Sequence, residues 1–287
     1  MPTDSIDTSS ISFTALYTGH TWLANDLAAP VFRTTAGSLY YHALTPFEWL
    51  GRGVLGDNFR TLLLQRHRIM DHLLEEAIET RGVTQVLEIA CGLSPRGCRF
   101  VRSYPELNYI ETDLPDMAAR KKALLDGIDG SVPQVMPINI FASDGELSLD
   151  HVLDQFDHSQ PIAVITEGLV VYFELDTITE FWRRLSRRLD EFPAGIYLSD
   201  DYPMGGGRSR PVQKMIQTAA RLLGTAARSP VSIHFEDDAQ MRDHLMALNF
   251  DEVSVHDPRA YYDVLPIPKS RGNPIVRVIE ARSDQGR

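Results

Sequence analysis

Hydrophobic and polar positions change along this chain in an order that predicts alternating strands and helices. Short apolar runs, typical of strands buried in a sheet, occupy residues 86–89, 108–112, 132–140, 161–166, 195–199, 252–256 and 275–281. Segments with apolar residues at helical spacing lie at residues 14–29, 58–80, 95–101, 115–125, 177–189 and 237–248. This alternation predicts an α/β three-layer sandwich.

Capping residues predict where some of the helices begin. Ser148 is expected to cap a short helix after the third strand. Thr177 and Glu180 form a T-x-x-E capping box, which predicts the start of the helix that ends near Leu189. The arginine pairs on that helix are expected to form its solvated face.

The most informative stretch joins the first strand to the following helix. Ala90-Cys91-Gly92 follows the apolar run and carries little side-chain bulk, so a ligand can approach the backbone there. A helix beginning near Pro95 would direct its free backbone amides at this turn. Asp113 ends the next strand, 21 positions after Gly92. An acidic residue at this spacing typically binds ribose hydroxyls, so the pattern predicts a nucleoside site, with a structural turn as the alternative.

The residues around the turn indicate which nucleoside is expected. A dinucleotide fingerprint needs three glycines as G-x-G-x-x-G, whereas this turn offers only Gly92 and Gly97. Glu88, just before the turn, would repel a pyrophosphate but could hold an ammonium group. The sequence therefore favours S-adenosylmethionine over NAD.

Composition narrows the class of protein. With 287 residues, 43% of them hydrophobic, the chain can bury a substantial core as one large domain with an attached segment. A net charge of -11 argues against nucleic acid as a partner, since phosphate binding needs a basic surface. The chain shows neither a secretory signal nor an apolar run of the ~20 residues that span a bilayer. A cytoplasmic protein without membrane contact is expected.

Three motifs together resemble one known family. The strings LEIACGLSPRG, ETDLPDMAARKKALL and ITEGLVVYF are similar to the ELGAGLDTR, DLPEV and EGLLMYL motifs of the leucine carboxyl methyltransferase and polyketide O-methyltransferase family. They occur in the family's order, and the resemblance spans about residues 14–201. Ala90 replaces the first glycine of the first motif, and Ser94-Pro95 replaces its Asp-Thr pair.

The resemblance implies a class I methyltransferase (Rossmann-like) fold with a seven-stranded, mostly parallel sheet. It divides the chain into an N-terminal helical cap, residues 1–80, and an S-adenosylmethionine-binding domain, residues 81–287. In the family a segment like residues 14–29 lies over the active site, although ordinary docking of a terminal helix remains the alternative. A glycine-hinged insertion at about 201–230 is expected to form a lid.

The resemblance also implies roles for individual residues. Arg66, in RHRIMD, is expected to bind the carboxylate of the cofactor, with Arg68 the competing candidate. Glu167 and Tyr172 are the expected catalytic residues, although Tyr172 fits a buried aromatic anchor equally well. The full set of expected cofactor-binding residues is Arg66, Glu88, Ala90, Gly92, Arg96, Asp113, Leu114, Asn139, Ile140 and Glu167. No metal site is expected; the densest histidine and carboxylate grouping is His234 with residues 236–238.

These observations predict an S-adenosylmethionine-dependent O-methyltransferase that modifies a small molecule such as a polyketide-type metabolite of secondary metabolism. A carboxylate acceptor is favoured over a hydroxyl because it is already ionised, and the strand-tip segments contain no histidine to act as a base. His20, His234 and Tyr172 are the groups that could reach a hydroxyl. The alternative is a non-catalytic nucleoside-binding or protein-docking module on the same fold, and a homodimer is left open.

Overall fold

The structure is a computed structural model that describes residues 8–54, 58–205, 210, 213–214, 217–218 and 231–284. The lid expected at about 201–230 therefore lies mostly outside the described residues. Within the described ranges, no helix is long and apolar enough to cross a membrane.

Seven strands form one mixed sheet in the order β3-β2-β1-β4-β5-β7-β6. The strands are β1 (Gln85–Ile89), β2 (Asn108–Asp113), β3 (Gln134–Pro137), β4 (Ile162–Thr166), β5 (Ala194–Asp201), β6 (Glu252–His256) and β7 (Arg277–Asp284). The first five strands are parallel to one another, whereas β7 runs antiparallel to both β5 and β6. The predicted seven-stranded, mostly parallel sheet is confirmed, and the carboxyl ends of β1, β2, β4 and β5 share one edge.

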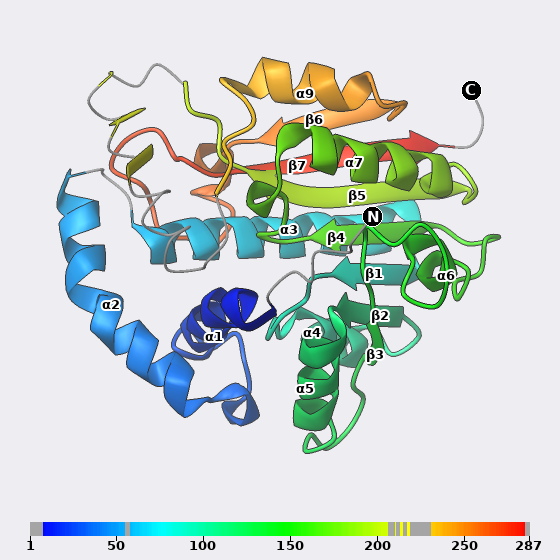
Figure 1. Cartoon of the computed structure of the whole chain (residues 1–287), viewed down its shortest axis with the longest axis horizontal. Helices are drawn as coiled ribbons and strands as arrows, with labels where there is room; N and C mark the ends of the chain where they lie inside the picture. The colour runs from blue at the N-terminus through cyan, green and yellow to red at the C-terminus, as the bar shows by residue number, and fades with distance from the viewer. Residues whose placement is uncertain are drawn as a thin grey trace, which may run out of the picture.

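Helices cover both faces of this sheet (Figure 1). They are α1 (Thr8–Leu23), α2 (Thr35–Val54), α3 (Phe59–Arg81), α4 (Arg96–Ser103), α5 (Pro115–Leu125), α6 (Leu149–Leu153), α7 (Leu175–Leu189) and α9 (Asp238–Met246), with short 3₁₀ turns η1 (Pro30–Phe32), η2 (Val170–Tyr172) and η3 (Pro258–Tyr261). The Asn58 side chain caps α3, and Ser148 caps α6 as predicted.

Several sequence predictions about element boundaries were wrong. The N-terminal helix covers Thr8–Leu23 instead of 14–29, and the last strand covers Arg277–Asp284 instead of 275–281. The third strand covers only Gln134–Pro137 instead of 132–140, because Pro133 and Pro137 bracket it and proline cannot donate to the ladder. The predicted capping box is also wrong, since α7 already begins at Leu175. Glu180 pairs with Arg183, one turn further on, at 2.5 Å.

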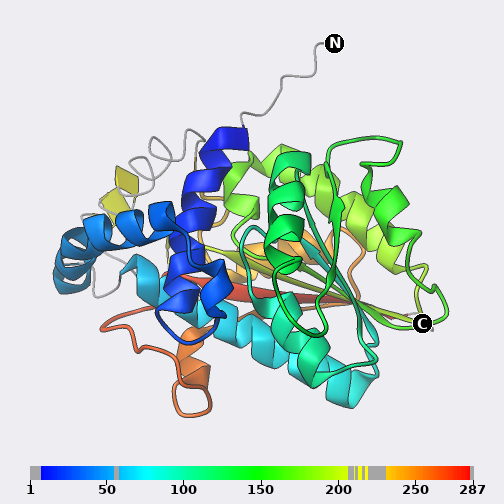
Figure 2. The same cartoon turned by 90° about the horizontal axis from the view of Figure 1, so that it is seen from below.

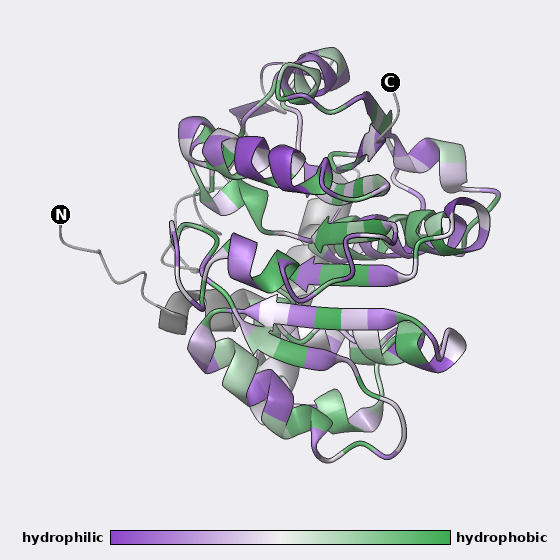
Figure 3. Cartoon of the chain, turned by 90° about the vertical axis from the view of Figure 1, so that its right-hand side faces the viewer, coloured by the Kyte–Doolittle hydropathy of each residue, from purple (hydrophilic) through white to green (hydrophobic). Residues whose placement is uncertain are grey.

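The core consists of two apolar layers, one on each face of the sheet. On one face α3 and α4 pack against β1, β4 and β5; on the other, α6, α7 and α9 cover the sheet. Figure 3 shows many hydrophobic positions along the strands and hydrophilic positions on the outer sides of the surrounding helices. On the second face Trp182 is fully buried, and its Nε1 donates to the Tyr197 hydroxyl at 3.0 Å. The three-layer sandwich predicted from the alternating pattern is confirmed.

The N-terminal helices α1 and α2 form a cap beside the sheet (Figure 2). Helix α1 packs directly on the glycine turn after β1: a Cβ on Gly19 would lie 3.0 Å from the Leu93 Cβ, and one on Gly92 would lie 3.3 Å from the Ala15 Cβ. The segment thus lies over the turn. Helix α3 instead packs on the sheet, and the domain division at residue 80 stays a prediction.

The turn after β1 adopts an unusual backbone conformation. Ala90 has a φ of +56°, in the left-handed region that glycine favours. This is the position where the sequence motif of the resembled family has glycine. Alanine at this position therefore carries local strain.

Replacing Ala90 with glycine is expected to stabilise the fold. A left-handed backbone costs an L-residue roughly 1–2 kcal/mol, whereas glycine in a folded chain loses roughly 0.5–1 kcal/mol to conformational entropy relative to alanine. Ala90→Gly should raise the free energy of unfolding in urea by up to about 1 kcal/mol. The control Ala119→Gly, at an exposed position of helix α5, should lower it by about 1 kcal/mol. A loss of the same size at both positions would contradict the left-handed conformation.

Candidate functional site

The glycine turn and the tip of β2 are joined by one carboxylate. The Gly92 amide donates to Asp113 Oδ2 at 2.8 Å, and the Leu114 amide donates to Oδ1 at 2.7 Å. Burial raises the pKa of Asp113, although these two amides oppose the shift. Each carboxylate oxygen can still accept a further hydrogen bond, so Asp113 can bind a pair of hydroxyl groups.

Arg96, in the first turn of α4, lies at the centre of a buried network of charges. Its guanidinium is fully buried and contacts Asp71 Oδ1 at 2.6 Å, Glu88 Oε1 at 2.7 Å and Glu167 Oε2 at 2.6 Å. The Tyr109 hydroxyl donates to the other oxygen of Glu88 at 2.6 Å. One side chain thereby connects α3, β1 and the tip of β4.

His67 extends this network along α3. Its Nδ1 lies 2.8 Å from Glu167 Oε2, and its ring stacks on Trp22 of the cap with centroids 4.1 Å apart. Arg99 Nη2 also donates to Asp71, which lies one turn after His67, at 2.5 Å. Burial alone would raise the pKa of Glu167, but His67, Arg96 and Arg66 hold it well below its usual value. Glu167 is therefore ionised at neutral pH.

Arg66 connects the network to the tips of β4 and β5. Its Nε donates to Glu167 Oε1 and its Nη1 to Asp200 Oδ2, both at 3.0 Å. Nη1 also donates to the Tyr202 hydroxyl at 2.6 Å. A Cβ on Gly168, whose φ is +68°, would lie 2.6 Å from Nη2, so glycine is needed where the guanidinium passes.

A second ion pair lies at the end of β5. His234 Nδ1 lies 2.9 Å from Asp201 Oδ2, and its Nε2 lies 2.8 Å from the Phe173 carbonyl. Because both partners are acceptors, both ring nitrogens must carry protons. Burial would lower the pKa of His234, but Asp201 raises it above its usual value. The two acceptors that face its ring nitrogens favour the charged imidazolium form of His234.

The structure brings together most of the predicted site residues in two groups. Arg66, Glu88, Arg96 and Glu167 belong to the charge network, whereas Ala90, Gly92, Asp113 and Leu114 form the turn and the β2 tip.

The remaining candidates are Asn139, Ile140 and Tyr172. Asn139 follows β3 and its Oδ1 accepts from the Phe141 amide at 3.1 Å. Ile140 is buried in the apolar core. Tyr172 of η2 is half-buried and packs against the same core.

Sequence reasoning missed His67, Asp71, Asp200 and Tyr202 as members of this site. The available signal was helical spacing: Asp71 follows His67 by four residues, so both lie on the buried face of α3 beside Arg66. Asp200 directly follows the predicted strand 195–199, but its partner Arg66 cannot be predicted from the sequence.

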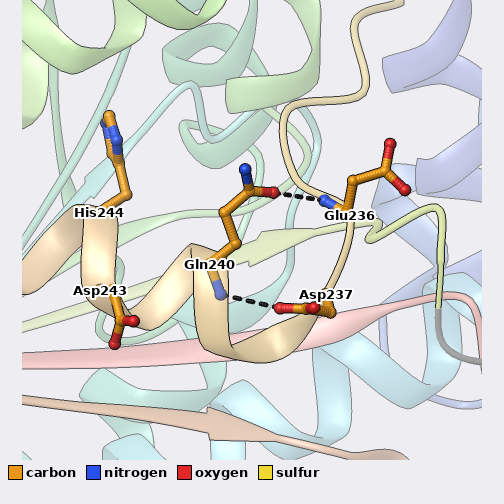
Figure 4. A pocket seen from close by; sticks show the side chains of 5 residues that line it. All are labelled: Glu236, Asp237, Gln240, Asp243 and His244. Atoms are coloured by element: carbon orange, nitrogen blue, oxygen red, sulfur yellow. Dashed lines mark hydrogen bonds between the residues drawn. The ribbon is translucent and has the colours of Figure 1, made fainter.

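An open pocket is lined by residues of α9 and of the segment that precedes it. Figure 4 shows its lining residues: Glu236, Asp237, Gln240, Asp243 and His244. The described parts of the chain contain no group of three or more His, Cys, Asp or Glu side chains placed to hold a metal ion. His234 is instead engaged by Asp201.

Comparisons with known proteins identify the family of this chain. The family model described as leucine carboxyl methyltransferase matches residues 22–185, more than half of the chain. A search of curated proteins found no match.

Solved structures show a similar fold. A putative methyltransferase from Thermobifida fusca YX is 15% identical, with a TM-score of 0.64 over 99% of this chain and 98% of that one. A duf574 family protein from Streptomyces avermitilis MA-4680 is 14% identical, with a TM-score of 0.64 over 94% and 97% of the two chains. PigF with SAH is 13% identical, with a TM-score of 0.51 over 85% and 73%.

Asp71→Asn should destabilise the protein in a pH-dependent way. Burial alone would raise the pKa of Asp71, but His67, Arg96 and Arg99 lower it from 3.8 to about 2. A depressed folded-state pKa contributes stability above the unfolded value, and this contribution is lost as the pH falls through the folded value. The shift corresponds to about 2 kcal/mol, present above about pH 4 and lost towards pH 2.

Urea denaturation of the unaltered protein and of Asp71→Asn at about pH 7, 5 and 3 would measure the gap between their free energies of unfolding. We expect about 2 kcal/mol at the two higher values and a smaller gap at the lowest. Asp263→Asn is the matched control, because Asp263 is 95% exposed in its pair with Lys269 and should show almost no gap. A gap for Asp71→Asn that does not change with pH would contradict the assignment.

Proposed function

Since the chain belongs to the leucine carboxyl methyltransferase family, we propose that it transfers a methyl group from S-adenosylmethionine to a carboxylate oxygen of a small molecule. Membership of an enzyme family favours catalysis over the alternative of a docking module. S-adenosylmethionine is the cofactor of such methyltransferases and supplies an activated methyl on its sulfonium. The acceptor proposal depends on the residues at the strand tips.

The turn and the β2 tip suit the nucleoside part of this cofactor. Asp113 is held by the Gly92 and Leu114 amides and would bind the ribose hydroxyls. Glycine at position 92 keeps the backbone open to a close ligand, although α1 covers the turn. We propose Asn139 and Ile140, which follow β3, as neighbours of the adenine ring.

Arg66 would bind the carboxylate of the cofactor's methionine end. Its Nη2 lies beside Gly168, whereas Nε donates to Glu167 and Nη1 donates to Asp200. A planar guanidinium oriented in this way suits a carboxylate ligand. We propose Glu88, Ala90 and Arg96 as further members of the cofactor site.

The observation that supports a carboxylate acceptor is the protonation state that the two hydrogen-bond partners of His234 favour. A hydroxyl acceptor must lose a proton to become a good nucleophile, whereas a carboxylic acid is already ionised at neutral pH. His234 holds protons on both ring nitrogens and so cannot accept one. His67 is fully buried against Glu167 and Trp22.

The other two base candidates are also poorly suited. His20 lies inside the cap, where its ring centroid is 4.8 Å from that of Tyr41 and 6.0 Å from that of His42. Tyr172 packs half-buried against the core. Glu167 and Tyr172 would then act by orienting the acceptor, and the rate enhancement would come from holding its oxygen in line with the methyl group.

The setting of the reaction follows from the bulk properties of the chain. The net charge of -11 disfavours nucleic acid as an acceptor. We propose a small-molecule acceptor of the polyketide type because the three sequence motifs resemble those of polyketide O-methyltransferases. Secondary metabolism, a cytoplasmic location and a homodimer stay predictions.

The chemical stability of the product tests this proposal. Purified protein would be incubated with methyl-labelled S-adenosylmethionine and matched carboxylic acids and phenols on one polyketide-type skeleton. We expect labelled product only from the acids, with methanol released by mild alkali and a rate that is flat above about pH 6. The control His234→Gln should keep this flat profile.

A base-stable methyl ether would reject the carboxylate acceptor. A rate that rises with a single ionisation near neutrality would do the same, and it would point to His20, His234 or Tyr172 as the base.

A further inference from the structure

A buried ion pair beneath the glycine turn has no role in the chemistry described above. Lys121 of α5 and Glu111 of β2 both have 0% exposure, and the Lys121 Nζ lies 3.0 Å from Glu111 Oε2. Burying two charges is costly, and apolar residues of similar size often serve stability equally well. A second role is therefore expected for this pair.

The second partner of Lys121 indicates that role. Its Nζ donates to the Ser94 carbonyl at 2.5 Å, and Ser94 lies in the turn between β1 and α4. The Ser94 amide in turn donates to the Cys91 carbonyl at 2.8 Å. The ammonium group therefore anchors the same tight turn that carries Gly92.

Glu111 supports the other end of this segment. A Cβ on Gly97, in the first turn of α4, would lie 2.4 Å from Glu111 Oε1, so the helix rests closely on the carboxylate. Phe32 of η1 covers the pair from the cap, with its ring centroid 5.5 Å from the ammonium. The turn and the start of α4 thus rest on two ionisable side chains that are sealed from water.

The charges of the pair depend on each other. Burial would lower the pKa of Lys121, but Glu111 raises it above its usual value. The pKa of Glu111 rises to about 7, chiefly because of burial, while Lys121 opposes the shift. Lys121 therefore remains a charged donor to Ser94 at neutral pH.

We propose that Lys121 is a positioning residue for the nucleoside site: its ammonium group, held by Glu111, fixes the Ser94 carbonyl and thereby sets the shape of the turn. This inference rests on the proposed binding of S-adenosylmethionine at that turn. Lys121 acts through the backbone and does not touch the ligand.

Two substitutions separate this role from stability. Lys121→Met and Glu111→Gln both break the ion pair, but only Lys121→Met removes the donor to Ser94. Isothermal titration with S-adenosylhomocysteine should show at least tenfold weaker binding for Lys121→Met and less than threefold weaker binding for Glu111→Gln. Lys122→Met, at the exposed neighbouring position, is the control and should bind as the unaltered protein does.

The double variant Lys121→Met with Glu111→Leu removes both charges. It should regain most of the thermal stability lost in Lys121→Met while its binding of S-adenosylhomocysteine stays at least tenfold weaker. Equal losses of affinity in Lys121→Met and Glu111→Gln would overturn the proposal. So would full affinity in a folded double variant.

A measurement without ligand keeps the two proposals distinguishable. Amide exchange at residues 94–97 should be at least tenfold faster in Lys121→Met than in Glu111→Gln, with β4 exchange unchanged. If the unaltered protein fails to bind S-adenosylhomocysteine, the proposed function fails, whereas this exchange difference still tests the anchor. Equal exchange in the two variants would overturn the anchor.

Discussion

The guanidinium of Arg96 is the interaction on which the strand-tip site depends. It is fully buried and bonded to carboxylates from α3, β1 and β4, so three separate parts of the chain meet at one charge. Removing one partner of a buried ion pair typically costs about 3–5 kcal/mol, because the remaining charge is left uncompensated. The network can therefore exist only when all these elements are in place.

The site combines this rigid network with a strained and anchored turn. Ala90 adopts a left-handed backbone, and Lys121 holds the turn from below. Helix α1 closes the turn from above, and Trp22 stacks on His67. The cap thereby contacts both the turn and the charge network, so ligand binding at the proposed site would be coupled to stability.

Much of this arrangement could be predicted from the sequence. The strand, small-residue turn and Asp113 follow from apolar runs and spacing, since strand ends in a parallel sheet meet at one edge. The exact partners could not be predicted, because a helix shows which residues share a face but not what lies opposite. His67 and Asp71 are examples, as their partners come from α4 and β4. Likewise, Pro133 and Pro137 shortened β3 where hydrophobicity alone suggested a longer strand.

The affinity of an Arg66→Met variant for two related ligands tests the account most directly. S-adenosylhomocysteine carries the amino-acid carboxylate, whereas 5′-methylthioadenosine lacks it. If Arg66 binds that carboxylate, titration should show a loss of about 1.5–3 kcal/mol for the first ligand and little change for the second. Arg68→Met, on the same helix, should change neither. Equal losses for both ligands in Arg66→Met would contradict the placement of the cofactor.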